Sequence, residues 1–208
     1  MTIKATSALS ILAIWVTMIA AVIAQPDQWW SLFFAFFATA AVGVSAWRRI
    51  GLARLLAISG TWFGTALAVG FSGAGWVAVF AFVSTGAIVY SVMRRDGLLI
   101  GAGIAAVWLF SGIVIANNAD GAWICVFAFL TTAALANTRG NDSRGVSAIL
   151  WWGIACAVMI AAGGGWTFVL AIAAFLLTTA SLGFGDFGFP RRLEWDLFDR
   201  DDDSDVVR

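Results

Sequence analysis

Long apolar stretches alternate with short polar connections along this 208-residue chain. Eight stretches lack charged residues and cover 8–24, 29–47, 55–72, 76–93, 98–116, 122–137, 146–162 and 166–183. A helix that spans a bilayer needs about 17 to 25 mainly apolar residues. The pattern therefore predicts an all-α, polytopic integral membrane protein with eight transmembrane helices.

Tryptophan divides these eight stretches into four similar pairs. One series consists of Trp15, Trp62, Trp108 and Trp152, and the other of Trp30, Trp76, Trp123 and Trp166. Each series advances by about 46 residues per step, a period typical of tandem structural repeats. We expect four tandem helical hairpins, at approximately 8–49, 55–95, 98–139 and 146–183, within one transmembrane domain of residues 1–183. They could surround an axis or form a curved row.

The first apolar stretch also has the features of a secretory signal peptide. Lys4 precedes an apolar core, and small residues follow it. However, Trp15 occupies the position that tryptophan has in the three later hairpins. We therefore expect this stretch to be retained as the first helix of the domain.

The two tryptophan series call for different explanations. The outer series begins each returning helix, where indole rings favour the membrane–water interface. The inner series, Trp15, Trp62, Trp108 and Trp152, lies at mid-span, where each indole N–H requires a hydrogen-bond partner. These four residues are candidates for contacts between repeats or with a ligand. No cofactor is predicted, although a bound lipid, quinone or pigment is left open.

Three threonines share one depth in the returning helices. Thr39, Thr85 and Thr132 each stand nine residues after an outer tryptophan, whereas the fourth hairpin has Phe175 there. One interpretation is a polar lining of a path through the bundle. The favoured interpretation is hydrogen bonding between helices, or to each threonine's own i−4 carbonyl, because such contacts need no pore.

The charged residues give the chain a direction across the membrane. All twelve basic residues lie at the same ends of the apolar stretches, and the alternate connections contain none. Short loops rich in Lys and Arg stay on the cytoplasmic side. We therefore expect an integral protein of a bacterial cytoplasmic, or inner, membrane, with both termini in the cytoplasm.

Composition argues against most chemistry at membrane depth. Hydrophobic residues make up 62% of the chain and charged residues 12%; histidine is absent, and no ionisable Asp, Glu, Lys or Arg lies inside a predicted span. Proton-coupled transport, hydrolysis and histidine-held metals each depend on such groups. We expect no enzyme activity, no catalytic residues, no metal site and no nucleic-acid partner.

Residues 184–208 form a cytoplasmic tail with eight of the twelve acidic residues. Its apolar residues Leu193, Trp195, Leu197 and Phe198 alternate partly with acids. This pattern suits an extended motif that docks on a partner, or equally an anchor at the lipid interface.

Two functional hypotheses follow from these observations. The first is an accessory or scaffolding subunit of a larger membrane complex, with the bilayer and other membrane-protein subunits as partners. The second is a channel or facilitator for a small neutral or apolar molecule. A homo-oligomer is compatible with either hypothesis.

Overall fold

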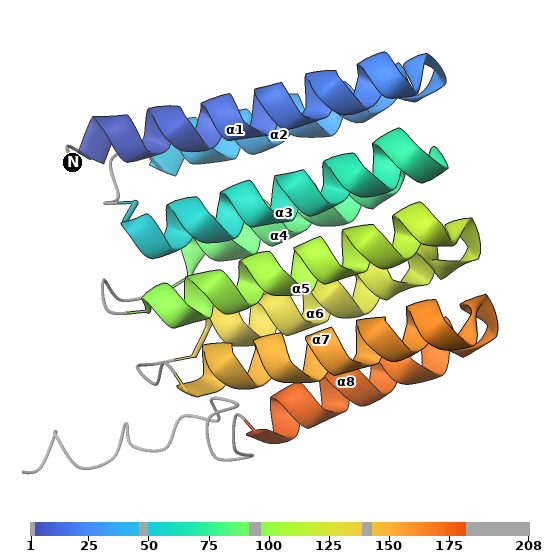
Figure 1. Cartoon of the computed structure of the whole chain (residues 1–208). Coiled ribbons are helices and arrows are strands. Elements are labelled where there is room, and N and C mark those ends of the chain that lie inside the picture. Colours follow the sequence, from blue (N-terminus) through green and yellow to red (C-terminus); the bar gives the residue numbers. More distant parts are fainter. Residues whose placement is uncertain (1–2, 46–49, 92–96, 139–142, 182–208) are drawn as a thin grey trace, which may run out of the picture.

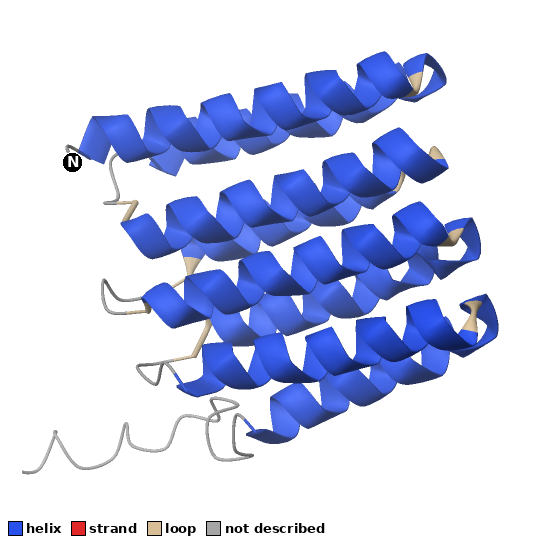
Figure 2. Cartoon of the chain, in the orientation of Figure 1, coloured by secondary structure: helices blue, strands red, loops and turns tan. Residues whose placement is uncertain are grey.

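A computed structural model describes residues 3–45, 50–91, 97–138 and 143–181, and the regular structure in these ranges is entirely helical (Figure 2). The α-helices are α1 (Ile3–Ala24), α2 (Leu32–Val44), α3 (Leu52–Ser72), α4 (Val77–Tyr90), α5 (Leu98–Asn117), α6 (Ile124–Ala136), α7 (Ser143–Ala162) and α8 (Thr167–Ser181). Short 3-10 helices precede three of them: η1 (Pro26–Ser31), η3 (Ala119–Trp123) and η4 (Gly164–Trp166). The predicted all-α class is confirmed.

The eight helices form four antiparallel hairpins in an open row of two layers (Figure 1). In one layer α1, α3, α5 and α7 pack side by side in chain order, and in the other α2, α4, α6 and α8 do the same. Each helix of the first layer also packs on its own hairpin partner in the second. Of the two arrangements that the sequence left open, the structure therefore shows the row.

Within the described ranges, five helical segments are long and apolar enough to cross a membrane: Ala5–Ala24, Leu52–Ser72, Leu98–Asn117, Ala119–Ala136 and Ser143–Ala162. The helices α2, α4 and α8 have 13, 14 and 15 residues and are shorter than the predicted apolar stretches. Part of the difference arises because each outer tryptophan lies in a 3-10 or turn segment before the returning α-helix. The rest arises because the last residues of the predicted stretches lie beyond the ends of the α-helices, partly outside the described ranges. Five apolar helices of spanning length indicate a membrane-integrated protein.

Large apolar side chains are exposed on both layers of the row. Leu12 and Leu150 are examples on the odd-numbered helices, and Phe33 and Leu176 on the even-numbered ones. The interior instead contains many alanines, serines and threonines that are almost fully buried. Extended apolar surface of this kind marks contact with a membrane or with another protein.

Glycine allows the odd-numbered helices to approach at backbone distance. A Cβ atom added to Gly64 of α3 would collide with the backbone of Trp108 in α5, and one added to Gly101 would collide with that of Ala53. In the next seam Gly145 of α7 lies against the backbone of α5 in the same way. Small residues at such seams let membrane helices gain close van der Waals contact.

Aromatic rings instead connect the even-numbered helices. The ring centroids of Phe34 and Phe82 lie 6.5 Å apart, and those of Phe80 and Phe129 lie 6.3 Å apart. Trp76 and Trp123 meet edge to face at 5.8 Å near the outer turns. These distances are typical of favourable aromatic pairs. The two layers therefore use different residue types to join the same four hairpins.

Polar contacts tie the helices together at the opposite end from the outer turns. Thr6 of α1 donates a hydrogen bond to the carbonyl of Ile50, which precedes α3, at 2.8 Å. In the last hairpin the hydroxyls of Ser147 in α7 and Ser181 in α8 are 2.7 Å apart. The second contact sets the register of α7 against α8.

Replacing Gly64 with alanine tests the close contact between α3 and α5. The new methyl group would meet backbone atoms that have no side-chain freedom, so we expect a loss of about 2 kcal/mol in unfolding free energy. Gly86→Ala in α4 is the control, because its Cβ would have no neighbour within 4 Å and alanine favours helix. Equal effects of the two substitutions on thermal unfolding in detergent would contradict this packing.

Candidate functional site

Two of the inner tryptophans donate hydrogen bonds to two of the threonines. The Nε1 atom of Trp62 in α3 lies 2.9 Å from Oγ1 of Thr85 in α4. The Nε1 atom of Trp108 in α5 lies 3.0 Å from Oγ1 of Thr132 in α6. Both indole rings are at most 1% exposed. Each bond joins the two helices of a single hairpin, and we call it the Trp–Thr link.

The hydroxyl of each threonine in a Trp–Thr link both donates and accepts a hydrogen bond. Thr85 donates to the carbonyl of Ala81 at 2.8 Å, and Thr132 donates to that of Ala128 at 2.7 Å. The same oxygen accepts the indole N–H, so neither the tryptophan nor the threonine contains an unpaired donor. Both threonines are fully buried. Their contacts match the favoured helix-to-helix interpretation of the threonine series.

The spacing between tryptophan and threonine along the chain allows the link to form. Thr85 follows Trp62 by 23 residues, and Thr132 follows Trp108 by 24. The odd helix runs to the outer turn, and the even helix returns antiparallel to the same depth. The spacing of 23 or 24 residues is thus the sequence signal that pairs the two series. It also separates Trp15 from Thr39, so it marks a candidate pair without deciding whether the bond forms.

The first hairpin contains the same residue types without the link. Trp15 and Thr39 are both half-buried, and Thr39 donates to its own i−4 carbonyl, that of Ala35, at 2.9 Å. Within the described ranges no hydrogen bond joins Trp15 to Thr39. The contact that the inner tryptophan makes in the central hairpins is thus absent from this end of the described row.

The last hairpin departs further from the pattern. Trp152 is fully buried, and in the described part of the chain its Nε1 atom has no hydrogen-bond partner. Phe175 occupies the place of the threonine, and the centroid of its ring lies 6.3 Å from that of Phe127 in α6. The nearby Thr178 is also fully buried, and its Oγ1 atom has no partner among the described residues.

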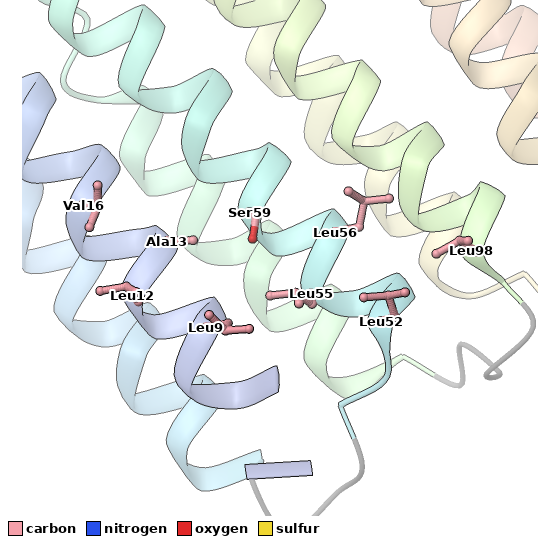
Figure 3. A pocket seen from close by; sticks show the side chains of 9 residues that line it. All are labelled: Leu9, Leu12, Ala13, Val16, Leu52, Leu55, Leu56, Ser59 and Leu98. Carbon is pink, nitrogen blue, oxygen red and sulfur yellow. The ribbon is translucent and has the colours of Figure 1, made fainter. Parts of the chain in front are cut away.

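An apolar groove of about 550 Å³ runs along the odd-numbered layer between α1 and α3. Figure 3 shows side chains of both helices bordering it. The lining residues are Leu9, Leu12, Ala13 and Val16 of α1, Leu52, Leu55, Leu56 and Ser59 of α3, and Leu98 of α5. No pattern in the sequence predicts this groove, because it forms only where two helices meet.

Glycine distinguishes this seam from the neighbouring one. Helix α1 contains no glycine, whereas glycines of α3 and α5 bring these two helices together at backbone distance. Against α1, a Cβ on Gly70 of α3 would lie 3.5 Å from the nearest atom, Ala21 Cα, an ordinary contact distance. At the other end of the same seam, leucines of α1 and α3 border the groove.

Other reactive groups are dispersed in the described ranges. Cys125 in α6 and Cys156 in α7 are buried free thiols. Within those ranges, no three His, Cys, Asp or Glu residues gather in a way that could hold a metal ion. The tail residues Leu193, Trp195, Leu197 and Phe198 lie outside the described residues.

Comparison with known proteins adds no relative to this picture. No protein-family model, curated protein or solved structure matches the chain. The candidate sites are therefore the Trp–Thr links inside the hairpins and the groove between α1 and α3.

Replacing Thr132 with valine tests the Trp–Thr link. Valine has nearly the same shape but leaves the indole N–H of Trp108 without an acceptor, so we expect a loss of about 1 kcal/mol in unfolding free energy. The neighbouring Thr131 is the control, because it is equally buried and bonds only to the carbonyl of Phe127. Thermal unfolding should be affected more by Thr132→Val than by Thr131→Val, and the reverse order would contradict the link.

Proposed function

We propose that this protein is a non-enzymatic accessory or scaffolding subunit of a larger membrane complex. The observation that carries the proposal is the use of buried polar groups in the central hairpins. The indole N–H groups of Trp62 and Trp108 and the hydroxyls of Thr85 and Thr132 are used by the Trp–Thr links and by bonds to backbone carbonyls. Among the described residues, the buried hydroxyl of Ser84 in α4 has no such partner. Polar groups used in this way support a rigid platform, and the contacts with partners would then lie on its surface.

The proposal includes eight membrane crossings in a bacterial cytoplasmic membrane, with both termini in the cytoplasm. The basic residues at one set of helix ends support this orientation. The segment from η1 to the end of α2, residues 26–44, has a length close to that of a spanning helix. Shorter even-numbered helices could be accommodated by local thinning of the bilayer, which costs little per ångström.

The first hairpin is the proposed partner-facing surface. The groove between its helix α1 and helix α3 of the second hairpin extends over residues 9–16 and 52–59, or about 10 Å along each helix. An α-helix with its side chains is about 10–12 Å across, so a partner helix would lie over the groove and insert a row of apolar side chains. Membrane helices associate through such van der Waals packing.

Filling the groove tests this surface. We expect Leu12→Trp to occupy the space that the partner side chains need and to reduce the recovery of a stoichiometric partner at least several-fold. Leu150→Trp on α7 is the control, because Leu150 is 56% exposed and Leu12 is 57% exposed. Recovery is measured by mass spectrometry after gentle solubilisation of native membranes. Equal recovery with both variants would contradict the role of the groove.

A substitution in the tail separates docking from lipid anchoring. Trp195→Ala combined with Leu197→Ala should release the partner if the tail docks on it, because two apolar anchors are lost. Val206→Ala combined with Val207→Ala is the control in the same tail. Retention of the partner together with weaker binding of a tail peptide to vesicles would favour the anchor.

The alternative function, a facilitator, has its own test. A monodisperse protein that lacks partners and raises the flux of small neutral solutes into liposomes would support a facilitator instead.

A further inference from the structure

The last hairpin contains two polar atoms in an apolar interior with no partner in the described part of the chain. They are Nε1 of Trp152 in α7 and Oγ1 of Thr178 in α8, and both residues are 0% exposed. In the second and third hairpins the corresponding indole N–H groups bond directly to threonine. An unpaired donor in an apolar environment is costly, so such a pair in one place needs an explanation.

Thr178 stands where the other hairpins have an aliphatic core residue. Twelve residues after the outer tryptophan, these hairpins have Val42, Ile88 and Leu135, all fully buried. Relative to Thr85 and Thr132, the hydroxyl of the last hairpin is thus displaced by three residues along its helix. Three residues correspond to about 4.5 Å of helical rise. The fourth hairpin thus contains both a tryptophan and a threonine, but the threonine stands three residues farther along its helix than in the other hairpins.

The register of α7 and α8 places the two groups at similar depths. The contact between Ser147 of α7 and Ser181 of α8 shows that these two residues lie at the same depth. Because the helices are antiparallel, Trp152, five residues after Ser147, lies at about the depth of Leu176, five residues before Ser181. Thr178 follows Leu176 by two residues, so its depth differs from that of Trp152 by about 3 Å of helical rise. Helical side chains lean toward the N-terminus of their helix, so Trp152 leans toward the level of Thr178.

We propose that one buried water molecule bridges Trp152 Nε1 and Thr178 Oγ1. Two hydrogen bonds of about 2.9 Å can connect atoms up to about 5.8 Å apart. This suits two groups that make no direct bond but belong to helices packed against each other. The water accepts the indole N–H and bonds to the hydroxyl of Thr178. Buried waters typically satisfy polar groups of this kind. The site takes a small neutral molecule with both a donor and an acceptor, and it replaces the direct Trp–Thr link.

Thr178→Val tests the proposal through the sign of its effect. If the hydroxyl holds the water, valine removes a bond and leaves Trp152 unpaired, so the midpoint of thermal unfolding should fall by about 2–6 °C. If the hydroxyl has no partner, the isosteric valine removes a desolvation penalty. An unchanged or higher midpoint would therefore overturn the proposal. Thr132→Val, which breaks a direct link, gives the reference decrease.

The same substitution in a Trp152→Phe background isolates the bridge. Phenylalanine lacks the N–H group, so the decrease caused by Thr178→Val should be at least halved in this background. A decrease of equal size in both backgrounds would show that the two groups are not coupled and would overturn the proposal.

A direct observation keeps the test independent of stability. An experimental map that resolves ordered water elsewhere in the protein should contain a peak within about 3.2 Å of both atoms. Absence of this peak from such a map would also overturn the proposal.

Discussion

The cost of leaving a polar group unpaired inside an apolar environment is the constraint on which this structure depends. An indole N–H or a hydroxyl at mid-span has no bulk water to bond and must find its partner inside the protein. In the central hairpins the Trp–Thr link satisfies both groups with one contact and joins two antiparallel helices. A large, rigid side chain is thereby held at a defined depth in each of these hairpins.

The two layers then extend this local order into a row. Glycine brings α3, α5 and α7 together at backbone distance, while phenylalanine and tryptophan rings connect the even-numbered helices. Both ends of the row differ from its centre, because the first and last hairpins lack the direct link. A groove also opens at the surface between α1, which contains no glycine, and α3. The surface features suited to contact with other molecules thus occur where the repeated pattern weakens.

Much of this architecture could be predicted from the sequence, because apolar length and short connections dictate antiparallel helices. The tryptophan and threonine series were visible, but their pairing depended on the register set by the outer turns. The same turns delay the start of the even-numbered α-helices by one to three residues, since Trp30, Trp123 and Trp166 lie in 3-10 segments. The groove and the unpaired Thr178 could not be predicted, because each depends on which neighbour a helix face meets. That information lies in tertiary packing, not in the pattern of one helix.

The central claim is that the Trp–Thr link holds each central hairpin together, and a double-mutant cycle on Trp108 and Thr132 tests it most directly. The free energy of unfolding would be measured in detergent for the parent protein, Trp108→Phe, Thr132→Val and the double variant. The account predicts a coupling of about 0.5–1 kcal/mol between the two residues. Strict additivity of the two single substitutions would contradict it.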